Sequence, residues 1–466
     1  MKSHLFQTSD VATPRLILLF AGWGMDHRPF RDIAVPGYDI CVAWDYRSLE
    51  TPFKEILNRY EEIAVVAWSF GVPATAKFIS DNPHLPITAK IAINGTQHPV
   101  DDTYGIPESI FQGTLDSLNE KNLGKFYLRM AGSSDRFKAF AANIPDRDIE
   151  ELKAELVAVK TAETPVIIWD KAIIANTDRI IPSDNQVNAW EKEALEIMQY
   201  DGAHLPDFNT MLPRLLTDKT LVQKRFHRAT KTYDTNAIIQ KHIAERLIDL
   251  WQPEQKSHLD ILEIGCGTGY STRLIYKKSH FGSLRLWDLT LSDEFVKEFT
   301  GDNTELSVCD AEIAIRNIPD ASLDAVISAS TVQWFNSLPT FLSQLARVLR
   351  PGGKAIISTF GPETMREINT ALGKKSTYPD TYTLRGMIPN TLNIEHLTEE
   401  ILTLTFASSI EALRHVSLTG VNALGSPVSP SATRALINSY PLQPSSEALL
   451  TYQPIYMILT KKNTHL

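Results

Sequence analysis

The chain contains 466 residues, of which 43% are hydrophobic, and its formal net charge is −9. This length exceeds what one hydrophobic core usually organises, so we expect two or three domains. The negative charge argues against general nucleic-acid binding, which needs a basic surface. No early apolar run is long enough to span a bilayer, and three widely separated cysteines indicate neither a disulfide framework nor a zinc site. We therefore expect a cytoplasmic protein without metal, nucleic-acid or membrane partners.

Short apolar runs that end at Gly, Asn or Asp occupy much of the first 180 residues and are typical of buried strands. These runs are PRLILLFAGWG, YDICVAWDYRSL, EIAVVAWSFG, ITAKIAING and PVIIWDKAIIAN. Several segments between them, such as GVPATAKFISDN, have helical spacing. This alternation predicts an α/β domain with a mostly parallel sheet.

The third run ends in the turn AWSFG at residues 67–71, with Ser69 at its centre. Small residues two positions before and after the serine allow the sharp strand-to-helix turn called a nucleophile elbow, although a helix-capping serine is the alternative. Asp178 and His204 follow later strands, which gives the order Ser, Asp, His expected of α/β-hydrolases. We predict that Ser69, Asp178 and His204 form a catalytic triad.

A second candidate for the triad acid lies in NGTQHPVDDTYGIP, where Asp101 and Asp102 follow an earlier strand. The sequence leaves open which of these acids or Asp178 completes the triad. Ester hydrolysis also needs N–H donors for the developing oxyanion. The turn FAGWGMD predicts that the backbone N–H groups of Trp23 and Phe70 form this oxyanion hole.

The motifs LLFAGWG, VAWSFGV, AINGTQHPVDDTYGIP and FQGTLDSLNEKN resemble the BioG-type pimeloyl-ACP methyl ester esterases across about residues 10–215. The resemblance implies an α/β-hydrolase with a helical cap at about residues 105–160. It also implies an acidic acyl carrier protein as partner. The cap residues that we expect to meet this carrier are Lys125, Arg129, Arg136 and Lys138.

A basic, polar stretch at residues 212–232 separates this series from a second one, and we divide the chain into domains 1–218 and 219–466. The second series also alternates strands with helices such as TFLSQLARVLR, and it predicts another α/β sheet. Its apolar runs are DILEIGCGTG, SLRLWDLT, ELSVCDAE, LDAVISAS, GKAIISTF and TYQPIYMILTKK.

A glycine-rich turn follows the first of these runs and contains Glu263, Gly265, Gly267 and Gly269. A dinucleotide fingerprint would need glycine at position 270 or 272, where the chain has other residues. The spacing E-x-G-x-G-x-G is instead typical of Rossmann-like class I methyltransferases that bind S-adenosylmethionine. We predict that these four residues bind that cofactor.

Two aspartates end the next two strands of this series and extend the predicted cofactor site. Asp288, nineteen residues after the last glycine of the turn, is placed to accept the ribose hydroxyls. Asp310 stands at the usual position for a contact to the adenine amine. Turn or helix-cap roles are the alternative for each.

Further motifs resemble the BioC-type malonyl-ACP O-methyltransferases across about residues 220–466. They are HRATKTYD, ILEIGCGTGYST, DAVISASTVQWF, VLRPGGKAIISTFGPETMREI and LRHVSLTGV. The resemblance places Gln333 and Trp334 at the mouth where the methyl group is transferred. Candidates for binding the malonyl group are Arg228, Tyr233 and Arg414.

Together the two resemblances imply a bifunctional enzyme of biotin biosynthesis. It would methylate malonyl-ACP and later hydrolyse the methyl ester of pimeloyl-ACP. Two alternatives stay open: a small-molecule methyltransferase fused to an unrelated esterase or thioesterase, and a methyltransferase whose degenerate hydrolase half docks carrier protein.

Overall fold

A computed structural model of the chain describes residues 1–7, 15–51, 53–251, 258–373, 376, 378–419 and 430–463. It divides into two compact units, residues 1–216 and 217–466, and each is described here by itself. Among the described residues, no helix combines the length and apolar character that a membrane span requires.

Unit 1 is built on a seven-stranded sheet with the order β1-β3-β2-β4-β5-β6-β7, in which only the β1–β3 pair is antiparallel. The central strands are buried on both faces, which explains why they appear in the sequence as continuous apolar runs. The strands are β1 (Lys2–Phe6), β2 (Arg15–Phe20), β3 (Asp39–Trp44), β4 (Glu62–Trp68), β5 (Ile87–Ile93), β6 (Trp169–Ala175) and β7 (Ala194–Tyr200).

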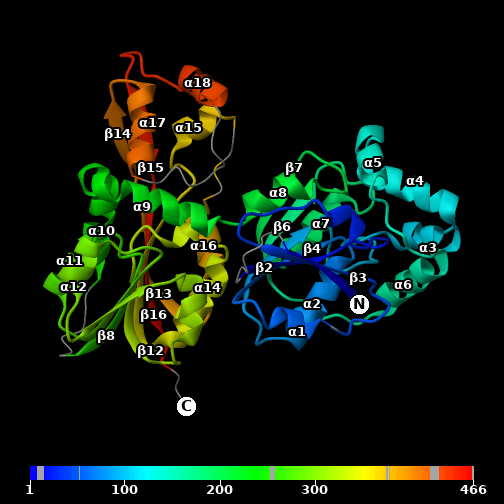
Figure 1. The fold of residues 1–466 in the computed structure, drawn as a ribbon, viewed down its shortest axis with the longest axis horizontal. Helices are drawn as coiled ribbons and strands as arrows, with labels where there is room; N and C mark the ends of the chain where they lie inside the picture. The colour runs from blue at the N-terminus through cyan, green and yellow to red at the C-terminus, as the bar shows by residue number, and fades with distance from the viewer. Residues whose placement is uncertain are drawn as a thin grey trace. The chain divides into compact units, whose positions relative to one another are not determined.

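The helices of unit 1 fall into two groups. Those that accompany the sheet are η1 (Arg28–Phe30), α1 (Lys54–Leu57), α2 (Gly71–Asp81), α7 (Ser183–Trp190) and α8 (Phe208–Leu215). The others lie between β5 and β6 and form the cap, which Figure 1 shows grouped at one side of the sheet. The cap helices are α3 (Glu108–Asp116), α4 (Glu120–Ala131), α5 (Ser134–Ala141) and α6 (Ile149–Thr161).

Unit 2 contains a second seven-stranded sheet, with the order β10-β9-β8-β11-β12-β16-β13. Strands β8 to β12 are parallel, whereas β16 runs antiparallel to both of its neighbours. The strands of this sheet are β8 (Leu259–Ile264), β9 (Phe281–Asp288), β10 (Thr304–Val308), β11 (Leu323–Ser328), β12 (Leu349–Phe360), β13 (Leu392–Glu399) and β16 (Pro454–Lys461).

Two separate hydrophobic clusters cover the two faces of this sheet. Ile261 belongs to one cluster and its neighbour Leu262 to the other, as the period of two in a strand requires. Figure 1 shows α10 and α11 on one side of the sheet and α14 and α16 on the other. The helices here are α9 (Lys219–Asn236), α10 (Ile238–Leu250), α11 (Tyr270–Lys278), α12 (Asp293–Phe299), α13 (Ala311–Ala314), η2 (Ile315–Asn317), η3 (Val332–Trp334), α14 (Leu338–Val348) and α16 (Thr381–Met387).

A small two-stranded sheet completes unit 2. It pairs β14 (Leu402–Phe406) with β15 (Ala448–Tyr452) and packs with α15 (Arg366–Ala371), α17 (Ser409–Leu418) and α18 (Pro430–Ser439). The two sheets confirm the expected α/β class. The strands β1, β13, β14 and β15 had not been predicted, because none contains a continuous apolar run as long as those used to identify the other strands.

Candidate active sites

Ser69 lies on a sharp turn between β4 and α2 in unit 1. Its φ of 56° is in the left-handed region, which costs a non-glycine residue free energy and is characteristic of strained functional turns. Gly71 is required two residues later, because a Cβ atom there would lie 2.3 Å from the backbone oxygen of Phe20. The local backbone therefore forms the nucleophile elbow that the sequence predicted.

The structure brings the three predicted triad residues together. His204 Nε2 lies 3.0 Å from the hydroxyl oxygen of Ser69, and His204 Nδ1 lies 2.8 Å from Asp178 Oδ2. The side chains of Asp178 and His204 are fully buried. With Nδ1 protonated and donating to the carboxylate, Nε2 is left as the acceptor for the serine proton.

Asp178 is held in place by further donors. Its Oδ1 accepts hydrogen bonds from the backbone N–H groups of Ile180 and Ile181, and its Oδ2 accepts a second bond from Gln186 Nε2 at 2.9 Å. The alternative acids lie elsewhere. Asp101 accepts from the N–H groups of Thr103 and Tyr104, and Asp102 accepts from that of Glu108, so both stabilise the turn that precedes α3.

Asn94, at the end of β5, fixes the loop that carries His204. Its Nδ2 donates to the carbonyl of His204 at 2.9 Å, while its Oδ1 accepts from the N–H of Ala175. The indole of Trp68 also donates to the His204 carbonyl, at 2.8 Å. Asn94 had not been singled out, although a polar residue at the carboxyl end of a buried strand is a signal for it. Gln186 has no comparable local signal.

The predicted oxyanion donors flank the serine. Within the described part of the chain, neither the backbone N–H of Trp23 nor that of Phe70 donates to a protein acceptor. Gly22 adjoins Ser69 closely, since a Cβ at that position would lie 3.2 Å from Ser69 Cβ. The indole Nε1 of Trp23 donates to the carbonyl of Leu152 in cap helix α6, at 3.0 Å. Two amides are thus available beside the hydroxyl.

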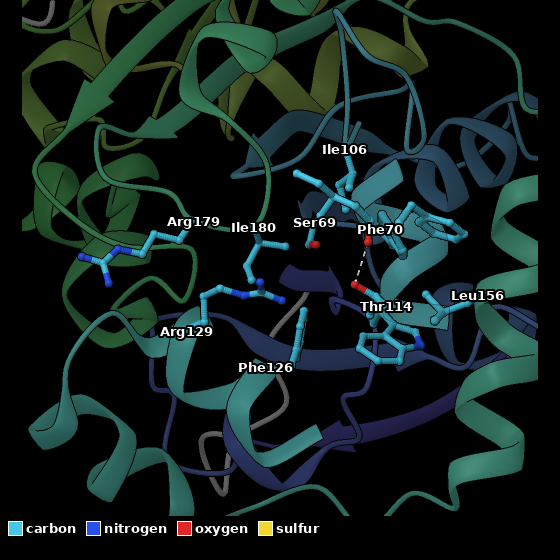
Figure 2. Close-up of a pocket in the computed structure, with 12 residues that line it drawn as sticks. Ser69, Phe70, Ile106, Thr114, Phe126, Arg129, Leu156, Arg179 and Ile180 are labelled. Atoms are coloured by element: carbon cyan, nitrogen blue, oxygen red, sulfur yellow. Dashed lines mark hydrogen bonds between the residues drawn. The ribbon is translucent and has the colours of Figure 1, made fainter. Parts of the chain in front are cut away.

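A small pocket of about 30 Å³ lies above Ser69, between the sheet and the cap. Figure 2 shows the Ser69 hydroxyl within it and the guanidinium of Arg129 directed toward it. Arg179, which directly follows the triad acid and had not been singled out, also lines the cavity. The remaining walls are mostly apolar: Trp23, Phe70, Ile106, Ile110, Phe111, Thr114, Phe126, Leu156 and Ile180. This lining suits an extended acyl chain.

The four cap cations have different surroundings. Lys125 and Arg129 are both exposed on α4. Arg136 is partly buried and donates to the carbonyl of Leu205, the residue after His204. Lys138 lies 3.8 Å from Asp135, and both of these side chains are exposed.

In unit 2, the glycine turn follows β8 and leads into α11. All three glycines have positive φ angles. A Cβ on Gly265 would collide with Thr331, and one on Gly269 would collide with Phe299, so these two are required by packing. At Gly267 the nearest atom to such a Cβ would be 4.0 Å away. Gly267 therefore faces open space, as a turn that cradles a ligand requires.

Glu263 and Asp288 stabilise this turn from within the sheet. The buried carboxylate of Glu263 accepts hydrogen bonds from the hydroxyls of Ser271 and Thr272 at the start of α11. Burial raises the pKa of Glu263 from its ordinary value of 4.5 to about 7. Asp288 Oδ2 accepts the N–H of Gly267 at 2.8 Å, and burial raises the pKa of Asp288. Glu263 thus supports the turn rather than lining its open side.

Asp310, the predicted adenine contact, forms an ion pair in this structure. Both of its carboxylate oxygens lie 3.1 Å from the Nζ of Lys219, the first residue of α9. The same Nζ lies 2.7 Å from Glu312. Since Lys219 is almost fully buried, this cluster joins the start of α9 to the carboxyl end of β10. No pattern in the sequence indicated this contact.

Helix α9 also reaches Trp334, one of the two residues predicted at the transfer mouth. Its Phe226 packs edge-to-face on Trp334, with ring centroids 5.8 Å apart, and contacts Tyr233 in the same helix. Gln333 donates to the carbonyl of Ser330. Arg228 and Arg414, the candidate cations for the malonyl group, are exposed.

Comparisons with known proteins match the two units separately and together. A family model described as pimeloyl-ACP methyl esterase BioG matches residues 4–211, and a methyltransferase-domain model matches residues 262–357. A Bacteroides fragilis protein named malonyl-(acyl-carrier protein) O-methyltransferase is 37% identical over 463 residues, covering 96% of this chain and 93% of that protein. A protein of the same name from Bacteroides helcogenes is 31% identical and covers 53% of this chain and 99% of that protein. The crystal structure of BioG from Haemophilus influenzae covers 44% of this chain and 94% of that chain, at 30% identity and a TM-score of 0.40.

Proposed function

This chain belongs to the family of the malonyl-(acyl-carrier protein) O-methyltransferases and carries a BioG domain ahead of its methyltransferase domain, and on this premise we propose a bifunctional enzyme of biotin synthesis. The comparisons confirm both resemblances that the motifs indicated. We assign ester hydrolysis to residues 1–218 and methyl transfer to residues 219–466, acting in the cytoplasm. The substrates are malonyl-ACP for the methyltransferase and pimeloyl-ACP methyl ester for the esterase.

The contact of Ser69 with His204, and of His204 with Asp178, carries the esterase assignment. His204 Nε2 takes the hydroxyl proton as Ser69 Oγ attacks the carbonyl of the methyl ester. The N–H groups of Trp23 and Phe70 stabilise the oxyanion. His204 then protonates the leaving methanol, and a water molecule activated by the same imidazole releases the free carboxylate and restores Ser69.

The residues around the glycine turn fit S-adenosylmethionine. Gly267 presents backbone to open space, and Asp288, at the end of β9, offers a carboxylate to ribose hydroxyls. Gly265 and Gly269 shape the turn, Glu263 supports it, and Asp310 stands at the adenine position. The cofactor supplies an electrophilic methyl group. The chain's task is then to align an acceptor oxygen with it, because a carboxylate is already ionised at neutral pH and needs no general base.

The two activities form a chemically coherent pair. A charged chain end is costly to bury in an apolar acyl tunnel, whereas its methyl ester is not. Methylation therefore allows chain elongation to begin from malonyl-ACP, and hydrolysis restores the carboxylate afterwards. The intermediates leave this chain between the two steps.

We propose that an acidic carrier protein docks on the cap beside the cavity mouth, at Lys125 and Arg129. Both residues are exposed, and Arg129 also lines the cavity above Ser69. Arg136 is assigned a positioning role instead, because it binds the carbonyl next to His204. Lys125→Glu should raise KM for carrier-bound ester and leave hydrolysis of a small methyl ester unchanged, with Lys153→Glu on α6 as the matched control. Arg129→Glu should also alter hydrolysis of the small ester, because Arg129 lines the cavity.

The deciding experiment is a mass measurement on the carrier protein. Purified chain is incubated with S-adenosylmethionine and malonyl-ACP, and separately with pimeloyl-ACP methyl ester. We expect the carrier to gain one methyl group in the first reaction and to lose one in the second. Methylation of small phenols in place of malonyl-ACP, or cleavage of the thioester in place of the methyl ester, would contradict the proposal.

A further inference from the structure

Several buried polar atoms without partners gather at the carboxyl edge of the sheet in unit 2. Within the described residues, no hydrogen bond is made by the hydroxyls of Tyr378 and Tyr452, the hydroxyl of Ser330, or the indole nitrogen of Trp334. Native proteins leave few such atoms unpaired, and each one needs an explanation. Ser330 has a φ of 54°, a strained conformation of the kind that clusters at functional sites.

The two tyrosines lie around the end of β12. The ring centroids of Tyr378 and Tyr452 are 6.0 and 6.2 Å from that of Phe360, the last residue of the strand. Tyr452 comes from β15 and is fully buried. These phenols therefore pack against the end of the central sheet.

The same phenols lie at the edge of the sheet that carries the glycine turn, because β12 and β8 both pair in parallel with β11 and the turn follows β8. Burial and then the neighbouring phenols of Tyr378, Tyr440 and Tyr233 raise the pKa of Tyr452. The pKa of Tyr233 is raised by burial and then by Asp288, the proposed ribose ligand. The phenol hydroxyls are protonated at neutral pH, so they can donate hydrogen bonds.

Two other buried tyrosines of unit 2 have hydrogen-bond partners within the protein. Tyr440 donates to the carbonyl of Leu449 at 2.6 Å, and Tyr456 donates to Glu400. The fold thus satisfies these phenols with protein partners. Tyr378 and Tyr452 remain as donors without a partner among the described residues, at the end of β12.

We propose that Tyr378 and Tyr452 donate hydrogen bonds to the carboxylate that receives the methyl group. This inference rests on the proposed function and names the groups that select its substrate. A carboxylate entering a buried site needs donors. Neutral phenols hold it in line with the methyl group without pairing it to a full positive charge. They also favour a chain that ends in a carboxylate over one that ends in a methyl group.

The test uses Tyr378→Phe and Tyr452→Phe, which remove only the hydroxyls. We expect kcat/KM for malonyl-ACP to fall about 10- to 100-fold in each variant, the range for a lost hydrogen bond to a charged group. Binding of S-adenosylmethionine, measured by calorimetry, should be unchanged. The melting temperature should stay the same or rise, because an unsatisfied buried group has been removed.

Tyr440→Phe is the matched control, since its hydroxyl has a protein partner. It should lower the melting temperature and leave KM for malonyl-ACP unchanged. If wild-type chain does not methylate malonyl-ACP, the proposed function itself fails. If wild-type chain does, but the Tyr378 and Tyr452 variants keep full kcat/KM, the inference is overturned. Loss of stability or of cofactor binding in those variants, in parallel with activity, would also overturn it by showing a structural role.

Discussion

Replacing Asp178 by asparagine tests the triad acid, for which the sequence left other candidate residues open. The asparagine would keep the oxygen that accepts from Ile180 and Ile181, but would place an NH2 group where Oδ2 now accepts from His204 and Gln186. That NH2 group would face His204 Nδ1 as a donor, which favours the tautomer with the proton on Nε2. In that tautomer Nε2 cannot accept the serine proton. The expected loss in kcat is on the order of 10⁴-fold, as found for this change in serine proteases, or about 5 kcal/mol of transition-state stabilisation.

The assay for Asp178→Asn is hydrolysis of a small methyl ester, with folding checked by circular dichroism. Asp101→Asn and Asp102→Asn are the matched controls, because the hydrogen bonds that those carboxylates accept within the described residues come from backbone N–H groups near α3. Each should retain activity within a few-fold of wild type. The reasoning is refuted if Asp178→Asn keeps a tenth of the wild-type rate, or if Asp101→Asn lowers the rate as strongly as Asp178→Asn does.

Three further predictions concern other parts of the chain. Ser69→Ala should abolish hydrolysis while methyl transfer continues, and Gly267→Val should abolish methyl transfer while hydrolysis continues, because the valine fills the open side of the turn. The two mass assays measure both activities. Loss of both activities from one folded variant would contradict separate sites. The pKa of Glu263 is raised from 4.5 to about 7, so the ionised form of this side chain destabilises the folded state. The free energy of unfolding should therefore fall by about 3 kcal/mol as the pH rises from 4.5 to 7. Glu263→Gln should therefore gain stability over wild type between pH 5 and 8, measured by hydrogen exchange of β8 peptides, whereas a pH-independent difference would argue against a buried titration. Esterase activity should fall on acidification, because protonated His204 cannot accept the serine proton, and a rate that stays constant in acid would exclude His204 as the base.

The sequence predicted those parts of the sites that depend on local backbone geometry. Ser69 and Gly267 occur in short patterns whose spacing is set by a turn between a strand and a helix, so the pattern and the geometry coincide. Asn94 and Gln186 escaped notice because their roles depend on contacts with residues farther along the chain, at His204 and Asp178. The order of strands then determines which side chains meet.

For charged residues, the spacing along the sequence likewise does not reveal which contacts each side chain makes. Spacing along the cap suggested one cluster of four cations, but Arg136 is partly buried and binds a backbone carbonyl. Asp310 stands where the pattern predicts a ligand for adenine, yet it also pairs with Lys219, which lies 91 residues away in the sequence. The phenols of Tyr378 and Tyr452, which have no partner among the described residues, are found only from the three-dimensional structure.

The hydrogen bond from the Trp23 indole to the Leu152 carbonyl has a consequence for engineering the esterase. Helix α6, which supplies that carbonyl, is further fixed by the buried Arg147–Glu155 ion pair, 2.9 Å long, whose carboxylate also accepts the backbone N–H of Tyr46. The cap therefore helps to hold Trp23, whose backbone N–H is a proposed oxyanion donor. A chimera that borrows the cap of another hydrolase to change chain-length preference would lose turnover on every ester, unless the graft ends before α6 and leaves this helix in place.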